Sequence, residues 1–235
     1  MSGAALVVHG LTGAPQSVAG LAVALEAEGF RVVLPLLPGH GTTPEDLARR
    51  SWAHWEAAVE DAFRVLGSSG PVVVAGLSMG AALAAGLAAR HPERVAGLIA
   101  VNPFVDPPAA AFQALLGELL AAGEAFLPGI GGDIADPAGR EEAYDRLPVA
   151  ALLSMCQGLD DLRPRLAGVR CPVLLFSSRH DHVVPSVSGD VLAAEVAGPV
   201  ERVWLERSQH VATLDVERDD LERRAVAFAR SVTAS

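Results

Sequence analysis

The feature that most constrains the fold is a repeated alternation between short apolar runs and longer stretches with helical spacing. The apolar runs are rich in β-branched residues, which is typical of strands buried on both faces of a parallel sheet. The expected strands are Ala4–Val8, Arg31–Leu34, Val72–Ala75, Val95–Val101, Val173–Ser177 and Arg202–Leu205. The expected helices are Gln16–Glu28, Trp52–Leu66, Ala81–Arg90, Val187–Val196 and Asp219–Val232. This alternation predicts an α/β protein with a mostly parallel, doubly wound sheet, in which ligands bind beyond the carboxyl ends of the strands.

The alternation fails between Pro103 and Pro148. This segment is rich in proline, contains the run Gly129-Ile130-Gly131-Gly132, and has one apolar patch with helical spacing that starts at Phe112. A long insertion of this kind is either a cap over the sheet or an irregular surface excursion. We favour the cap, because its apolar side chains need a surface to cover. The predicted organisation is a core formed by residues 1–102 and 149–235, with a cap or lid inserted over residues 103–148.

The length of 235 residues suits one sizeable hydrophobic core. The formal net charge is −10 and every basic residue is arginine. An acidic chain without a basic stripe is a poor candidate for binding nucleic acid, because phosphate contacts need clustered positive charge. The two cysteines, Cys156 and Cys171, lack the spacing of a metal site and are expected to be buried free thiols, although a disulfide remains an alternative.

One uncharged stretch, residues 71–89, nearly reaches the length of a membrane span. It changes from a valine run to an alanine-rich run and contains three glycines, which indicates a buried strand followed by a buried helix. The first residues show no basic region of the kind that opens a signal peptide. A cytoplasmic protein without a stable membrane anchor, either a monomer or a homodimer, is therefore expected.

The pentapeptide Gly76-Leu77-Ser78-Met79-Gly80 lies between the expected strand Val72–Ala75 and the expected helix Ala81–Arg90. A strand–turn–helix context is what a G-x-S-x-G nucleophile elbow requires, since its serine occupies a strained turn. The glycines allow close backbone approach, and the start of the helix directs amides at a developing oxyanion. Ser78 is the predicted nucleophile; the alternative is a structural serine.

A serine hydroxyl needs a base that takes its proton, usually a histidine held by a carboxylate. After this type of elbow the chain order is nucleophile, acid, base. Of seven histidines, three precede the serine, one ends the serine's own helix, and two flank the expected acid on the same turn. The excluded histidines are His9, His40, His54, His91, His180 and His182. His210 remains as the predicted base, in a short loop between the last expected strand and the last helix; the alternative is an exposed loop histidine.

Asp181 is the predicted acid, because it comes four residues after the strand Val173–Ser177, whereas nearby aspartates precede that strand or lie in the next helix. A rival interpretation is a metal site formed by His180-Asp181-His182, but no second cluster completes a closed set of ligands. No metal and no organic cofactor is expected.

The segment His9-Gly10-Leu11-Thr12-Gly13 follows the first expected strand, and its glycines leave the backbone amide of Leu11 free to face the site. Together with the amide of Met79 it would form an oxyanion hole with two donors.

These motifs resemble those of the bacterial carboxylesterases and monoacylglycerol lipases of the α/β-hydrolase superfamily. The matching stretches occur in order along nearly the whole chain. They are His9–Gly13, Pro38-Gly39-His40-Gly41-Thr42, Gly76–Gly80, Asp181-His182-Val183-Val184-Pro185 and Ser208-Gln209-His210-Val211-Ala212-Thr213-Leu214-Asp215. The resemblance implies a small cap, and it places Ile130, Asp133 and Glu141 in the second half of that cap. Ile130 and Glu141 are candidate substrate contacts; the alternative for Glu141 is a solvated surface residue.

The implied activity is hydrolysis of short- to medium-chain carboxylic esters, with monoacylglycerols as the leading natural substrates. The triad Ser78, Asp181 and His210 would act through an acyl-enzyme. The alternatives are a thioesterase or a C–C bond hydrolase that uses the same triad. Relatives carry more residues before the first strand, so a slightly smaller sheet is expected here.

Overall fold

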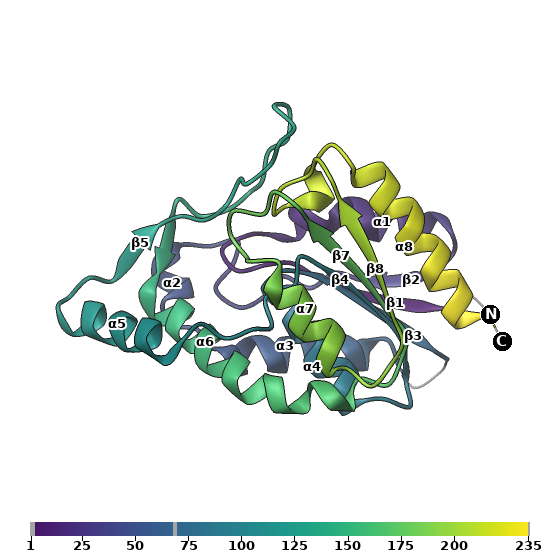
Figure 1. Cartoon of the computed structure of the whole chain (residues 1–235), viewed down its shortest axis with the longest axis horizontal. Helices are drawn as coiled ribbons and strands as arrows, with labels where there is room; N and C mark the ends of the chain where they lie inside the picture. The colour runs from purple at the N-terminus through teal and green to yellow at the C-terminus, as the bar shows by residue number, and fades with distance from the viewer. Residues whose placement is uncertain (1–2, 68–69, 235) are drawn as a thin grey trace.

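A computed structural model describes residues 3–67 and 70–234 of the chain. Its main sheet has six strands in the order β2-β1-β3-β4-β7-β8, and every neighbouring pair is parallel (Figure 1). The strands are β1 (Ala4–Val8), β2 (Arg31–Val33), β3 (Val72–Leu77), β4 (Val95–Val101), β7 (Val173–Ser178) and β8 (Val200–Leu205). The prediction of a mostly parallel α/β sheet is confirmed.

Helices cover both faces of this sheet, because alternate residues of each central strand belong to two different cores. On one face Val7, Ala75 and Phe176 pack with α1 (Ala19–Ala27) and α8 (Arg218–Thr233). On the other face the intervening strand residues pack with a larger set of helices. These are α3 (Trp52–Val65), α4 (Met79–Arg90), α6 (Val149–Leu162) and α7 (Val187–Glu195). The fold is therefore doubly wound, as predicted.

Helix α6 was not predicted, although Leu152, Cys156, Leu159 and Leu162 repeat at helical spacing and are all buried. The helix packs closely against the start of α3, because a Cβ atom at Gly158 would lie 2.1 Å from the Trp52 ring. Helix α4 begins at Met79 and not at Ala81, directly after the serine of the elbow. The first predicted helix is preceded by a 3₁₀ turn, η1 (Pro15–Val18).

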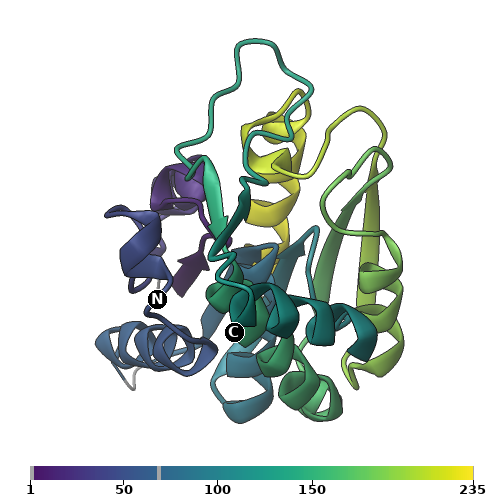
Figure 2. The same ribbon diagram turned by 90° about the vertical axis from the view of Figure 1, so that its left-hand side faces the viewer.

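The inserted segment contains α5 (Ala110–Ala121) and a two-stranded antiparallel sheet of β5 (Phe126–Pro128) and β6 (Arg146–Pro148). Figure 2 shows the connection between β5 and β6 rising above the carboxyl ends of the main strands, beside the C-terminal part of the chain. Its arrangement suits a cap; the boundaries at residues 103 and 148 stay a prediction.

The remaining elements are the short helix α2 (Pro44–Leu47), which follows β2, and two further 3₁₀ helices, η2 (Arg163–Gly168) and η3 (Ala212–Leu214). Within the described residues, none of the helices is both long enough and apolar enough to cross a lipid bilayer.

Candidate active site

Ser78 lies at the sharp turn between β3 and α4. Its backbone has φ 56° and ψ −120°, a conformation in which a residue with a Cβ atom is strained. The turn is anchored by a hydrogen bond of 3.0 Å from the Ser78 amide to the carbonyl of Val101 in β4. The side chain of Ser78 remains on the wall of a cavity, as expected of a nucleophile elbow.

The glycines on either side of Ser78 are required by backbone contacts. A Cβ atom at Gly80 would lie 2.2 Å from the carbonyl oxygen of Val8, and one at Gly76 would lie 2.3 Å from the carbonyl carbon of Gly80. Real Cβ atoms do not approach backbone atoms so closely. The first turn of α4 is therefore packed directly against the end of β1, which brings Ser78 next to the loop that begins at His9.

The predicted acid and base are in direct contact. Nδ1 of His210 lies 2.8 Å from Oδ2 of Asp181, and both side chains are almost fully buried. The other carboxylate oxygen of Asp181 accepts hydrogen bonds from the amides of Val183 (2.9 Å) and Val184 (2.7 Å). Because the carboxylate fixes the Nδ1 proton, Nε2 of His210 is left as the nitrogen that can accept a proton.

The three predicted catalytic residues follow three different strands of one sheet: Ser78 follows β3, Asp181 follows β7, and His210 follows β8. All three loops lie at the carboxyl ends of parallel strands. Within the described part of the chain, no hydrogen bond joins the Ser78 hydroxyl to the His210 ring. In enzymes without substrate such bonds are often long and tighten only when substrate binds.

The backbone of His210 is held on both sides. Its amide donates to Oδ2 of Asp133 at 3.0 Å, and its carbonyl accepts from Nδ2 of Asn102 at 2.8 Å. Asn102 has φ 42° at the end of β4 and also bonds to Ser178. The role of Asn102 was missed, because an isolated asparagine after a strand carries no sequence signal of a contact with residue 210.

Asp215 and Glu217 fix residues 206–209, which with His210 form the loop after β8, called the base loop below. Asp215 is fully buried and accepts from four amides, those of Ala135, Asp136, Gln209 and Val216, at 2.7–2.9 Å. Glu217 accepts from the amides of residues 206–208 and from the Ser208 hydroxyl. Asp215 was part of the quoted motif, but its role as a link between the base loop and the inserted segment was not predicted.

The loop predicted to supply the oxyanion hole is fixed by the buried ring of His9. The Leu37 amide donates to Nε2 of His9 at 3.1 Å, so the proton of the neutral ring is on Nδ1, which donates to the Gly10 carbonyl at 2.9 Å. Burial lowers the pKa of His9 to about 4, which keeps the ring neutral at neutral pH. The Leu11 amide belongs to the same peptide unit as the Gly10 carbonyl and points in the opposite direction.

Neither the Leu11 amide nor the Met79 amide has a hydrogen-bond acceptor among the described residues. Met79 is the first residue of α4, where an amide has no partner inside the helix. Both amides are therefore free donors, as an oxyanion hole requires, and their role there stays a prediction.

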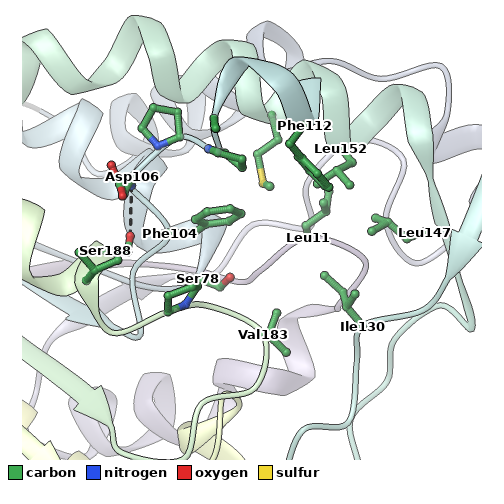
Figure 3. Close-up of a pocket in the computed structure, with 16 residues that line it drawn as sticks. Leu11, Ser78, Phe104, Asp106, Phe112, Ile130, Leu147, Leu152, Val183 and Ser188 are labelled. Atoms are coloured by element: carbon green, nitrogen blue, oxygen red, sulfur yellow. Dashed lines mark hydrogen bonds between the residues drawn. The ribbon is translucent and has the colours of Figure 1, made fainter. Parts of the chain in front are cut away.

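A cavity of about 440 Å³ opens in front of Ser78 (Figure 3). Its walls are mostly apolar and come from the core and from the inserted segment: Leu11, Phe104, Phe112, Ile130, Leu152 and Val183. Ile130, one of the two candidate contacts of the cap, lines this cavity. Such a lining suits an acyl chain or another apolar group.

Glu141, the other candidate contact, does not line the cavity but is half-buried beside the loop of Leu11. Its Oε2 accepts from the Gly132 amide at 2.8 Å, and its Oε1 would lie 3.1 Å from a Cβ atom at Gly13. Burial raises the pKa of the Glu141 carboxyl.

The two histidines that flank Asp181 do not join it in a metal site. His182 bonds to Asp133 through Nδ1 at 2.7 Å, and His180 is exposed. Across residues 3–67 and 70–234, no group of three or more His, Cys, Asp or Glu side chains is placed to hold a metal ion.

Comparison with known proteins gives consistent matches over most of the chain. A sequence model described as the alpha/beta hydrolase family matches residues 5–224. A thermostable monoacylglycerol lipase of Bacillus sp. (strain H-257) is 38% identical over 226 residues, covering 95% of this chain and 88% of the lipase. A carboxylesterase of Bacillus subtilis (strain 168) is 26% identical over 228 residues, covering 96% of this chain and 91% of the esterase.

Solved structures are also similar. A structure from work on LipS and LipT, two metagenome-derived lipolytic enzymes, has a TM-score of 0.92 and 36% identity, and the match covers 98% of this chain and 95% of that one. The monoacylglycerol lipase of Paleococcus ferrophilus has a TM-score of 0.79 at 18% identity, with 98% and 97% of the two chains covered. The latter match supports the fold alone.

Proposed function

This chain belongs to the alpha/beta hydrolase family, and on that basis we propose that it is a serine hydrolase of carboxylic esters. The proposed nucleophile is Ser78, with His210 as base and Asp181 as the acid that orients it. The observation that carries the proposal is the buried Asp181–His210 pair, 2.8 Å apart, at the same edge of the sheet as the strained turn of Ser78. The lipolytic relatives, similar over nearly the full length, support the same reaction class.

The proposed reaction has two steps. Nε2 of His210 takes the proton of the Ser78 hydroxyl as the oxygen attacks the ester carbonyl, and the imidazolium then gives this proton to the departing alcohol. Water next attacks the acyl-enzyme, with His210 again as base, and releases the carboxylic acid and free Ser78. Asp181 keeps the proton of the neutral ring on Nδ1 and stabilises the imidazolium.

The amides of Leu11 and Met79 are proposed to stabilise the negative oxygen of each tetrahedral intermediate. Both donors belong to rigid backbone: the Leu11 peptide is set by the His9–Gly10 hydrogen bond and the Met79 amide by the first turn of α4. Preorganised donors of this kind need no rearrangement as charge develops, and the loss of one typically lowers kcat by about 100- to 1,000-fold.

The proposed substrates are short- to medium-chain esters, with monoacylglycerols as the leading natural candidates. The cavity lined by Leu152 and Ile130 would take the acyl chain, since it is apolar and adjoins Ser78. Glu141 lies on the side of the Leu11 loop, where a half-buried carboxyl group would serve a polar alcohol such as glycerol. A relative described as a monoacylglycerol lipase supports this choice.

The test is to replace Ser78 with alanine and to measure hydrolysis of p-nitrophenyl butyrate and of a monoacylglycerol. Loss of the nucleophile should lower kcat by at least about 10⁴-fold, as in other serine enzymes, while the thermal unfolding midpoint stays close to that of the wild type. Hydrolysis that survives in the purified variant would refute the assignment. Parallel rates on an ester, a thioester and a vinylogous diketone would distinguish the esterase from the alternatives on the same triad.

A cytoplasmic location, with the protein acting as a monomer or homodimer, is also part of the proposal. The two cysteines are free and buried, and burial raises the pKa of both Cys156 and Cys171 to about 11. Unreactive buried thiols are typical of proteins from a reducing compartment.

A further inference from the structure

Asp133 in the inserted segment makes contacts that link the two loops of the proposed acid and base. Its Oδ2 accepts from the amide of His182 at 3.1 Å and from the amide of His210 at 3.0 Å. Its Oδ1 lies 2.7 Å from Nδ1 of His182. Its backbone carbonyl accepts from the amide of Val211 at 3.0 Å. One residue thus bonds to the neighbour of Asp181 and to His210 itself.

This residue reaches the site from a distant part of the chain. Asp133 lies in the connection between β5 and β6, which Figure 2 shows above the sheet beside the C-terminal segment. The contacts join residues that are 49 and 77 positions apart in the sequence. The cap is therefore bonded directly to the loops after β7 and β8.

The carboxylate form of Asp133 fits these contacts, because two backbone amides donate to it and His182 can donate through Nδ1. Burial opposes ionisation, but the hydrogen bonds from His182 and His210 outweigh this effect and lower the pKa of Asp133. The hydrogen bond to Asp133 in turn raises the pKa of His182, an exposed residue. The charge of Asp181 also raises the pKa of His182.

We propose that Asp133 is a positioning residue for ester hydrolysis: it sets the spacing between the Asp181 and His210 loops and thereby aims the imidazole at Ser78. This inference rests on the function proposed above. Asp133 does not line the cavity and contacts no reacting atom, so it acts through His210 and the turn at His182. The cap then contributes to the catalytic geometry in addition to covering the acyl site.

The mechanism predicts an effect on turnover more than on substrate binding. Without the Asp133 carboxylate the amide of His210, in a residue that is 6% exposed, loses its acceptor, and the loop is free to shift. Proton transfer depends steeply on the position of the base, and a displacement of about 1 Å can lower the rate about 100-fold. The walls of the cavity stay intact, so KM should change little.

Four variants distinguish the positioning of His210 from the effect of the ion pair with His182 and from a general effect of losing a carboxylate in the inserted segment. Asp133→Ala removes both carboxylate oxygens, Asp133→Asn keeps one acceptor, and His182→Gln removes the ion pair but leaves both backbone bonds to Asp133. Asp145→Ala is the matched control, because this carboxylate lies in the same inserted segment and its side chain is 92% exposed. For each variant we would measure kcat and KM on p-nitrophenyl butyrate, the rate of phosphonylation by a fluorophosphonate, and the thermal unfolding midpoint.

The expected result is a fall in kcat of about 10- to 100-fold for Asp133→Ala, with KM within about twofold of the wild type. Asp133→Asn should be intermediate, and His182→Gln and Asp145→Ala should stay within about threefold of the wild type. The phosphonylation rate should fall in parallel with kcat. If Asp133→Ala does not fold, kcat of Asp133→Asn is compared with kcat of His182→Gln. Only the Asp133 substitution alters the bond to the His210 amide, so a larger loss of kcat in Asp133→Asn supports the proposal.

Three outcomes would overturn the inference: an unchanged kcat in Asp133→Ala, a raised KM at constant kcat, or equal losses in Asp133→Ala and His182→Gln. Failure of the proposed function looks different, since the wild type itself would then hydrolyse no ester and resist phosphonylation. If the wild type is phosphonylated but cleaves another kind of acyl substrate, the phosphonylation rates of the Asp133 variants still test the role of Asp133. An unreactive wild type would refute both proposals.

Discussion

At the scale of single residues, the candidate site is built from buried polar side chains whose main partners are backbone groups. Asp215, Asn102 and His9 each bind a peptide group in a loop that carries, or adjoins, a proposed functional residue. A buried group that loses such a partner costs about 1–3 kcal/mol, so these loops have few alternative conformations. Ordered loops of this kind explain how residues outside regular elements can hold a catalytic geometry.

His40 is an exception, because among the described residues neither of its buried ring nitrogens makes a hydrogen bond of ordinary geometry, and the nearby backbone of Pro38 and Leu37 offsets its burial only in part. Its ring packs edge-on to His9, with centroids 4.9 Å apart. Burial, followed by the charge that His9 would carry, lowers the pKa of His40 to about 3. We predict that this residue makes the protein sensitive to acid: below pH 6.5 the unfolded chain binds a proton at His40, whereas the folded chain does not until about pH 3.

The free energy of unfolding rises with pH wherever the unfolded state binds more protons than the folded state does. The free energy of unfolding should fall as pH decreases from 6.5, and His40 alone should contribute a slope of up to about 1.4 kcal/mol per pH unit. Urea unfolding between pH 4 and pH 7 measures this slope. In His40→Leu the slope should be smaller by up to about 1.4 kcal/mol per pH unit, which corresponds to the uptake of one proton. An identical slope in both proteins would contradict the assignment.

At the scale of elements, the elbow depends on how closely α4 approaches β1. Gly80→Ala should disrupt the fold, because the added Cβ atom would meet the carbonyl oxygens of Val8 and His9, at 2.2 and 2.5 Å, and backbone cannot yield as a side chain can. We predict that the free energy of unfolding falls by about 3 kcal/mol, or that the variant fails to fold.

Gly117→Ala in α5 is the matched control. A Cβ atom there meets nothing within 4 Å, and alanine is the better helix former, so stability should rise by about 0.5–1 kcal/mol. Thermal or urea unfolding of both variants tests the pair. Equal effects of the two substitutions would show that close packing of the elbow does not limit stability.

The elements that the sequence predicted well are those with a strong local pattern. The apolar runs predicted all six strands of the main sheet to within two residues at either end. The four inner strands are buried on both faces and apolar at almost every position, whereas the outer strands β2 and β8 are only partly buried. Helix α6 was missed despite its helical spacing, and the pair β5 and β6 was missed because three-residue strands leave no periodic signal.

The predicted site shows the same division. Ser78, Asp181 and His210 could be proposed from the sequence because each follows a recognisable strand, at the carboxyl ends where ligands bind in such sheets. The contacts of Asp133 and Asn102 could not, since they depend on how the cap and β4 meet the base loop in three dimensions. Sequence separations of 77 and 108 residues give no local pattern.

At the scale of the whole molecule, the fold brings together groups from all parts of the chain at one edge. The proposed oxyanion loop follows β1, the proposed nucleophile follows β3, and the proposed acid and base follow β7 and β8, while the inserted segment supplies Asp133 and Ile130. In a parallel sheet all these loops leave from the same edge, so the topology alone places them near one another.

The most direct test of this convergence is peptide mapping after reaction with a fluorophosphonate, in which the serine oxygen displaces fluoride from phosphorus. The account predicts one adduct, on Ser78, and a phosphonylation rate at least about 100-fold lower in His210→Ala. An adduct on another side chain, or an unchanged rate in that variant, would contradict the claim that His210 activates Ser78.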